Sequence, residues 1–202
     1  LGVGNVDEKS FDKNAFKSNY FQIVDSVEDL FNSIDNKNMI DKYPNNRVIA
    51  GYAREWKSKK QAQKNKGKAY NERPYDWIFD LGNGNEIRKR WNYRFQSWLS
   101  YKNSEKEIGC IHSIQGIDLN YVGVIVGKDL TVKDGKYVVD INNYFDKVGT
   151  PLKGDKGKVN IDELTDYVLN IYYVLLTRAI NGLYVYFEDK EVEKLFRSRS
   201  GL

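Results

Sequence analysis

Polar side chains interrupt two apolar runs at His112-Ser113-Ile114-Gln115-Gly116-Ile117-Asp118. Such a break predicts a loop at the end of a sheet, which is where open α/β sheets bind their ligands. A loop of small and polar residues can bring its backbone close to a phosphate, and Gly116 removes the side chain that would obstruct that approach. Gln115 can donate a hydrogen bond to the same phosphate. The pattern therefore indicates contact with a phosphate-bearing ligand.

Few other side chains in the sequence could carry out catalysis. The chain has one cysteine, Cys110, and one histidine, His112, so neither an intramolecular disulfide nor a structural zinc site can form. Without a second histidine to activate it, Cys110 is expected to be a small core or loop residue rather than a nucleophile. Taken by itself, His112 could be only a hydrogen-bonded loop residue.

The composition indicates an ordinary globular domain with a core. Apolar residues make up 41% of the chain, and 32 basic against 28 acidic residues give a net charge of +4, which alone does not argue for nucleic acid. No apolar run approaches the ~20 residues of a membrane span, and no signal peptide is recognisable. With a single cysteine, a reducing compartment is expected. We therefore expect a cytoplasmic protein with no membrane partner.

The elements that must position the polar loop alternate between strands and helices. Apolar runs predict strands at 21–25, 47–53, 107–113, 121–127 and 183–187, a hairpin around Asp134-Gly135, and helices after Ser26, at 161–180 and at 188–198. This alternation predicts an α/β fold with a mainly parallel sheet flanked by helices. We expect a lead-in segment at 1–20 and one domain at 21–202. Because the chain starts with Leu1 and a polar stretch, we also expect a fragment of a longer protein.

An insertion rich in basic and aromatic residues lies around 54–98. Its first part, 54–73, holds eight Lys or Arg against two Glu, and all four tryptophans of the chain fall between 56 and 98. One interpretation is a platform for single-stranded nucleic acid, with bases stacked on the aromatic rings. Its phosphate contacts would come from Lys57, Lys59, Lys60, Arg88 and Arg90. The alternative is a solvated loop above an aromatic core.

Two segments together resemble superfamily 1 helicases. The strand–loop–strand around 112–118 resembles motif V, roughly Thr-x-His-x-x-Lys/Gln-Gly-Leu-Glu followed by an apolar strand. Tyr173-Val-Leu-Leu-Thr-Arg-Ala and the strand after it resemble motif VI. The closer resemblance is to an uncharacterised bacterial ATP/GTP-binding, helicase-like family related to Schlafen proteins. It covers about 20–197 and is carried by 47–52, Trp91-Asn92, 109–130, the hairpin at 133–136 and 170–186.

The resemblance implies a RecA-like domain of the P-loop NTPase type and assigns roles to individual residues. Arg178 matches the arginine finger, which stabilises charge on a transferring phosphoryl group and is worth ~10³–10⁵ in rate. The expected nucleotide contacts are Gln115, Gly116, Asp118 and Thr177, and the expected nucleic-acid contacts from the loop are Cys110, His112 and Ser113.

Some positions depart from the family pattern or have a simpler explanation. Asp118 stands where relatives carry a Glu that accepts a ribose hydroxyl, and Asp is one methylene shorter. Cys110 stands where many relatives have Thr facing single-stranded DNA. An isolated arginine at a helix C-terminus, as at 178, could merely bind the last carbonyl groups.

Two motifs of the first helicase domain are absent. Four Gly-Lys pairs occur, at 67, 127, 135 and 157, but none is followed by the Ser or Thr of a phosphate-binding loop. No Asp-Glu pair follows an apolar strand. We therefore expect this chain to be the second, C-terminal domain, inactive alone, with ATP and Mg²⁺ held mainly by an N-terminal P-loop domain of the same parent chain.

Two functions from different classes fit these residues. The first is the C-terminal part of an ATP-dependent, helicase-like motor acting on single-stranded or duplex nucleic acid. The alternative is a non-motor module, nucleotide-switched or nucleic-acid-binding, within a defence or restriction system. Asp118 and Cys110 depart from the family pattern and so favour the module, whereas Thr177-Arg178 matches the pattern and favours the motor.

Overall fold

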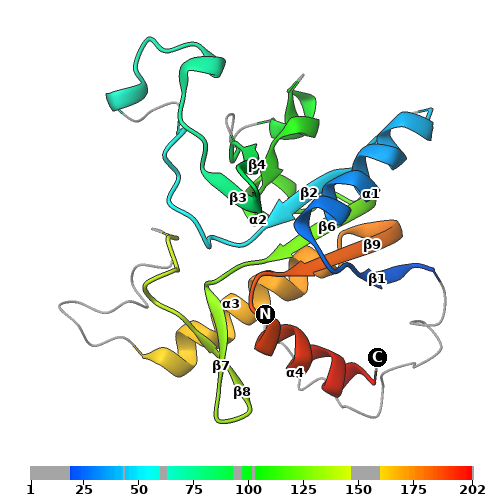
Figure 1. Ribbon diagram of the computed structural model, residues 1–202, viewed down its shortest axis with the longest axis vertical. Helices are drawn as coiled ribbons and strands as arrows, with labels where there is room; N and C mark the ends of the chain where they lie inside the picture. The colour runs from blue at the N-terminus through cyan, green and yellow to red at the C-terminus, as the bar shows by residue number, and fades with distance from the viewer. Residues whose placement is uncertain are drawn as a thin grey trace.

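The computed structural model describes residues 19–42, 44–59, 63–92, 97–101, 103–146 and 160–201. Its centre is a five-stranded parallel sheet in the order β1-β9-β6-β2-β5 (Figure 1). The strands are β1 (Phe21–Ile23), β2 (Arg47–Ala50), β5 (Ile108–Gly109), β6 (Leu119–Val126) and β9 (Ala179–Phe187). The predicted α/β architecture with a mainly parallel sheet is therefore confirmed.

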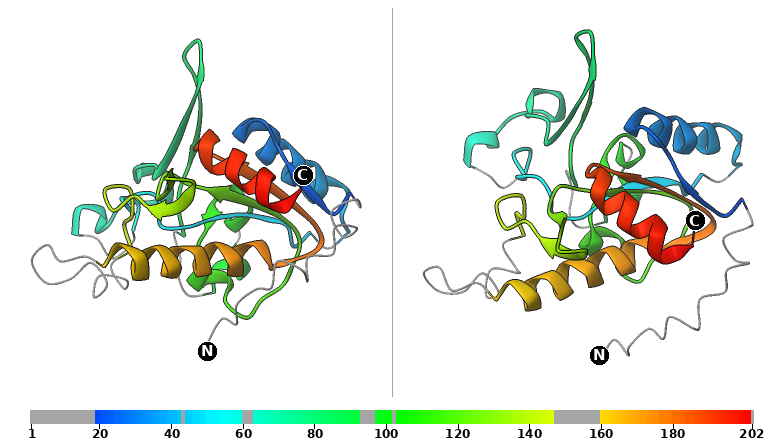
Figure 2. Two further views of the ribbon diagram at one scale, coloured as in Figure 1. Left: turned by 90° about the horizontal axis from the view of Figure 1, so that it is seen from below. Right: turned by 60° about the horizontal axis from the view of Figure 1, so that its bottom comes forward.

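Two helices, α1 (Val27–Ile40) and α3 (Ile161–Leu176), lie on opposite faces of this sheet (Figure 2). The α1 helix begins where the sequence predicts, because the Ser26 hydroxyl accepts the Asp29 N–H at 3.0 Å. A side chain at Gly123 of β6 would meet Leu30 and Ile34 of α1 at 3.1–3.2 Å. The missing side chain thus allows α1 to pack closely on β6.

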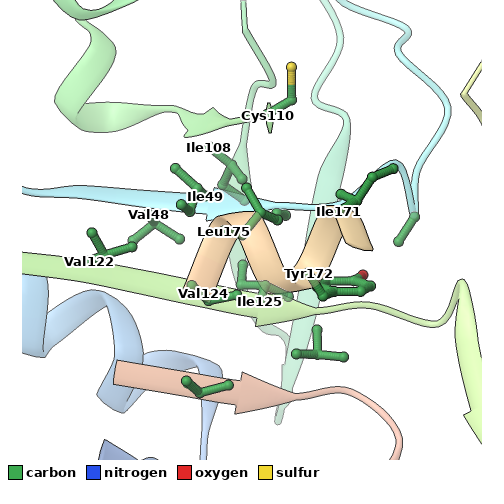
Figure 3. Packing of buried hydrophobic residues seen from close by; sticks show 14 of the residues in the cluster. Val48, Ile49, Ile108, Cys110, Val122, Val124, Ile125, Ile171, Tyr172 and Leu175 are labelled. Atoms are coloured by element: carbon green, nitrogen blue, oxygen red, sulfur yellow. The ribbon is translucent and has the colours of Figure 1, made fainter. Parts of the chain in front are cut away.

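The core lies between the sheet and α3. Figure 3 shows Ile171, Tyr172 and Leu175 of α3 against the strands. Leu175 and the β2 residue Ile49 are completely buried. The α3 residues are spaced three and four apart, so they form one apolar face of the helix. Burial of that face fixes α3, and with it the segment that follows α3 in the chain.

The last helix, α4 (Lys190–Ser200), packs near the edge strand β1. The ring of Phe196 lies 5.9 Å from that of Phe21 in β1 and 5.3 Å from that of Phe187 in β9, between ring centroids. The predicted terminal amphipathic helix is therefore present, and its apolar side closes one end of the core.

Two hairpins accompany the sheet. One, β7 (Leu130–Lys133) and β8 (Lys136–Val139), turns at Asp134-Gly135 as predicted, and both turn residues have positive φ angles of 51° and 70°. The other, β3 (Trp77–Gly82) and β4 (Asn85–Lys89), belongs to the insertion and projects away from the sheet (Figure 2). The sequence predicted no strands within this insertion.

The junction between α3 and β9 differs from the prediction. The helix ends at Leu176 rather than near 180, and β9 begins at Ala179 rather than at Leu183. The backbone N–H of Leu119 in β6 bonds the Arg178 carbonyl at 2.8 Å, so pairing with β6 starts directly after the helix. Pairing between strands distant in sequence overrides the helical periodicity that continues through this junction.

Candidate functional site

The polar loop predicted between two strands connects the carboxyl end of β5 to the amino end of β6. It contains a single helical turn, α2 (Ile111–Ile114), followed by four exposed residues at 115–118. Gly116 has a φ of +74°, a conformation that residues with a side chain rarely adopt. Its position is open, because a Cβ there would meet no atom within 4 Å. The backbone at Gly116 is therefore free for another molecule to approach.

The insertion holds this loop through Asn92. The side-chain oxygen of Asn92 accepts the Ser113 hydroxyl at 2.8 Å and the Cys110 N–H at 3.1 Å. The backbone N–H of Asn92 donates to the Ile108 carbonyl at 3.2 Å. Asn92 is buried and has a φ of +42°, which asparagine tolerates better than most residues. The sequence motif included Asn92, but nothing in its pattern predicted that it would position a loop some twenty residues away.

Arg178 and Asp118 meet at the amino ends of β9 and β6. Their side chains form an ion pair, with 3.5 Å between Arg178 Nη1 and Asp118 Oδ1. Arg178 Nε donates to the Val174 carbonyl in the last turn of α3 at 3.1 Å, and Nη2 donates to the Thr177 hydroxyl at 3.3 Å. The two segments that resemble motifs V and VI are thus brought together in space.

The ion pair is too exposed to be a strong structural bond. The Asp118 side chain is 64% exposed and that of Arg178 is 22% exposed, and pairs of this kind contribute about 0–1 kcal/mol. The bond from Nε satisfies a helix carbonyl, as the simpler explanation for this arginine expects, but it leaves Nη1 facing only Asp118 among the described residues. An incoming anion could therefore replace Asp118 at small cost.

The predicted nucleotide contacts and the predicted strand contacts differ in exposure. Gln115, Gly116, Asp118 and Thr177 are all exposed, and the last two contact Arg178. Ser113 is buried and bonded to Asn92, and Cys110 is completely buried with Sγ 3.5 Å from the Tyr52 hydroxyl. Burial also raises the pKa of the Cys110 thiol, which keeps it unreactive. The side chains of Ser113 and Cys110 therefore support the loop from inside and do not face a strand in this conformation.

His112 is intermediate in exposure between these two groups. It is half-buried, and its ring stands 5.7 Å from that of Tyr52 in an edge-to-face arrangement. His112 lies on α2, just before the exposed residues 115–118 in the chain, but its own side chain is only partly exposed.

The basic residues of the insertion also divide into two groups. Lys57, Lys59 and Arg88 are exposed, and Arg88 is paired with Glu86 at 2.6 Å. Arg90 is buried, where its guanidinium donates to the carbonyls of Asn71 and Arg73 and lies over the ring of Tyr75 at 4.2 Å. Arg90 thus supports the loop at 70–75 and is unavailable as a surface contact. Lys60 lies outside the described residues.

The tryptophans extend the core instead of forming an open platform. Trp77, Trp91 and Trp98 are at most 1% exposed. The Trp91 ring lies 6.2 Å from that of Trp77 and 4.6 Å from that of Tyr52. Trp56 is half-buried, with Lys59 Nζ 5.0 Å from its ring. Of the two interpretations of this insertion, the aromatic core is therefore the one observed.

A buried polar network that sequence reasoning missed lies at the opposite, carboxyl end of the sheet. Tyr172 donates to Asp129 Oδ1 and accepts the Gly127 N–H at 2.9 Å. Burial raises the pKa of Asp129 to about 7, although the bond from Tyr172 lowers it. Nearby, Arg54 pairs with Glu188. This network ties the insertion to α3 and to the ends of β6 and β9.

Two further features are absent from the described residues. No group of three or more His, Cys, Asp or Glu side chains in that part of the chain is arranged to hold a metal ion. None of the helices in the same residues has the length and apolar character needed to cross a membrane.

Known proteins are similar to this chain over much of its length. Over 122 residues the chain is 32% identical to "Uncharacterized protein YPL245W" of Saccharomyces cerevisiae, a match that covers 56% of this chain and 26% of the yeast protein. No solved structure matches significantly. The bacterial subfamily expected from the sequence is not distinguished by these matches. Residues 3–189 match the family described as "Schlafen group 3, DNA/RNA helicase domain", and the chain therefore belongs to this Schlafen-related, helicase-like family.

Proposed function

We propose that this chain is the C-terminal RecA-like domain of an NTP-dependent, helicase-like protein that acts on nucleic acid. In this proposal it supplies Arg178 and the 115–118 loop to a cleft shared with an N-terminal P-loop domain of the parent chain. The observation that carries the proposal is the meeting of Arg178 with Asp118, which joins two separate helicase-like segments at one exposed edge. Family membership supports the helicase-like part.

The geometry suits Arg178 to the role of an arginine finger. Its side chain is anchored at Nε by the Val174 carbonyl, so the guanidinium is oriented before a ligand arrives. Its outer nitrogen, Nη1, faces an exposed carboxylate that competes only weakly for it. When a nucleoside triphosphate enters the cleft, Arg178 would leave Asp118 and bind the terminal phosphate. Bound Mg²⁺ would neutralise phosphate charge from the other domain.

The loop would contribute hydrogen bonds to the nucleotide. Gly116 presents open backbone, and Gln115 is exposed beside it. Once released by Arg178, the Asp118 carboxylate could accept a hydroxyl group of the ribose. Binding at both sides of the cleft would draw the two domains together, and this motion would move the bound strand.

The test is the ATPase rate of the full-length protein, with and without single-stranded DNA and RNA, for wild type and Arg178→Ala. We expect strand-stimulated turnover in the wild type and a loss of ~10³-fold or more in the variant. Arg178→Lys keeps the charge but not the planar fork, so it should recover only a small part of the rate. Lys194→Ala on the exposed side of α4 is the matched control and should turn over normally. Normal turnover by Arg178→Ala would refute the finger role.

One alternative has its own support in the structure. The Asp118 carboxylate is already engaged by Arg178, and Cys110 is sealed inside the domain. Both facts suit a nucleotide-switched or nucleic-acid-binding module that does not act as a motor, for example in a defence or restriction system. Strand binding without turnover in the same wild-type assay would favour this module.

A further inference from the structure

A hollow opens beside α1, away from the Arg178 side chain. Its volume is about 520 Å³, within the range of small-ligand sites. Its walls come from the segment before β1, from β1, β6 and β9, and from the last turn of α1. The lining residues are Asn19, Tyr20, Gln22, Lys37, Tyr121, Asn181 and Tyr184.

Four polar groups around this hollow are free to bind a ligand. Within the described part of the chain, the Lys37 ammonium, the Asn181 amide and the hydroxyls of Tyr121 and Tyr184 have no hydrogen-bond partner. Lys37 has no carboxylate partner there either, and its Nζ lies 4.4 Å from the centroid of the Tyr121 ring. Polar groups from three different elements thus line one hollow without hydrogen bonds between them.

A role in the fold explains only one of these groups. A lysine in the last turn of a helix interacts favourably with the helix dipole, and a cation over a tyrosine ring adds about 0.5–1 kcal/mol at an exposed site. Lys37 could therefore be structural. Neither effect accounts for the exposed Asn181 amide or for the open hydroxyl of Tyr184, whose ring is otherwise buried.

The composition of the lining selects the kind of ligand. Its one charged residue is Lys37, and none of the lining residues is acidic, so an anion is favoured. Three tyrosines and three side-chain amides offer aromatic surface and hydrogen bonds to a planar polar ring. A phosphate joined to a heterocyclic base has both features. We propose that this hollow binds one nucleotide unit, with Lys37 on the phosphate and the base against the Tyr121 ring that Lys37 uncovers.

This site is distinct from the one around Arg178. Tyr121 and Asn181 each lie three residues beyond Asp118 and Arg178 along β6 and β9, which corresponds to about 10 Å of strand. The Arg178 side chain turns back toward α3, whereas the hollow lies beside α1. The same nucleotide chemistry could be offered by a single strand or by a free mononucleotide.

The experiment measures binding of fluorescein-labelled (dT)15 and (U)15 to the 202-residue chain by anisotropy, at several salt concentrations. Unlabelled AMP and ATP are tested as ligands by calorimetry. Variants are Lys37→Ala, Lys37→Glu and Tyr121→Phe, with Lys194→Ala as the control. Thermal unfolding of each variant confirms that it is folded.

We expect Lys37→Ala to weaken oligonucleotide binding about tenfold and to lower the slope of log K against log salt by about 0.7, the value for one phosphate contact on a single strand. Lys37→Glu should weaken it further, while Tyr121→Phe, which keeps the ring but loses the hydroxyl, should weaken it less than Lys37→Ala does. Lys194→Ala should bind normally, because its side chain does not line the hollow. Oligonucleotide binding is measured without ATP, so its outcome does not depend on the proposed ATPase role.

The remaining outcomes identify the ligand or overturn the proposal. Mononucleotide binding that is lost in Lys37→Ala, with no oligonucleotide binding, would assign the hollow to a free nucleotide. Binding of oligonucleotides alone would assign it to a strand. Equal binding by wild type and Lys37→Ala, an unchanged salt slope, or no binding of any of these probes would overturn the proposal.

Discussion

Asn92 and Ser113 lie 2.8 Å apart, oxygen to oxygen, and this bond joins the insertion to the polar loop. Asn92→Ala would remove one of two acceptors for both the Ser113 hydroxyl and the buried Cys110 N–H, and alanine tolerates the positive φ less well. We expect a loss of about 1–3 kcal/mol in the free energy of unfolding, measured in urea.

A double-mutant cycle tests whether this loss arises from the bond itself. Ser113→Ala alone should cost less than Asn92→Ala, because only the second variant also places an alanine at a positive φ. The double variant should be more stable than the sum of the two single losses predicts. Strict additivity would show that Asn92 acts through its backbone conformation and not through Ser113.

Gly127 is enclosed so tightly that a methyl group there would collide with the side chain of Ala53. Gly127→Ala should therefore cost about 1–3 kcal/mol of stability through overpacking. The double variant Gly127→Ala, Ala53→Gly frees the space and should be more stable than Gly127→Ala alone in thermal unfolding. If the second substitution gives no recovery, the clash with Ala53 is not the cause.

Asp129 should make stability depend on pH. Its pKa is raised to about 7 in the folded chain, mainly by burial, whereas an unfolded Asp titrates near 3.9. Between these values the folded state binds a proton that the unfolded state does not, so the free energy of unfolding falls as pH rises through about 4 to 7.

The matched variants are Asp129→Asn and Asp166→Asn. The first keeps an oxygen acceptor for Tyr172 but cannot ionise, so unfolding in urea between pH 5 and 8 should lose this component of the pH dependence. The second removes an exposed carboxyl from α3 and should retain it. A pH profile for Asp129→Asn that matches the wild type would contradict the raised pKa.

Trp91 should matter to stability more than to strand binding. Because it is completely buried against Tyr52 and Trp77, Trp91→Ala should cost about 3–5 kcal/mol, whereas Trp91→Phe should cost less. Trp56→Ala, at a half-buried position, is the control and should have a smaller effect on urea unfolding. A folded Trp91→Ala chain with wild-type stability and impaired strand binding would instead favour the stacking platform.

The features that the sequence predicted well depend on neighbouring residues. Ser26 as a helix cap and Asp134-Gly135 as a hairpin turn follow from local bonds and allowed φ angles, and both are observed. The alternation of apolar strands and helices likewise predicted the parallel sheet. Family motifs added the expectation that the segments around Asp118 and Arg178 belong to one site, and the structure places those two side chains together.

The features that the sequence did not predict depend on contacts between distant segments. Arg90 and the tryptophans have the residue types of a nucleic-acid surface, and only the folded chain shows that Arg90 is buried over Tyr75. The start of β9 at Ala179 depends on pairing with β6 some sixty residues earlier. The role of Asn92 has no signature, because its partners lie in a loop that composition alone does not connect to it.

The position of β9 sets the order in which the chain can complete its fold during synthesis. β9 is made after the other four strands of the sheet, yet it lies between β1 and β6, and β1 pairs with no other strand among the described residues. Until β9 has been synthesised, β1 has no pairing partner and one edge of β6 is unpaired. A polypeptide released before Phe187 would therefore expose both edges together, which makes late truncation of this domain a route to aggregation.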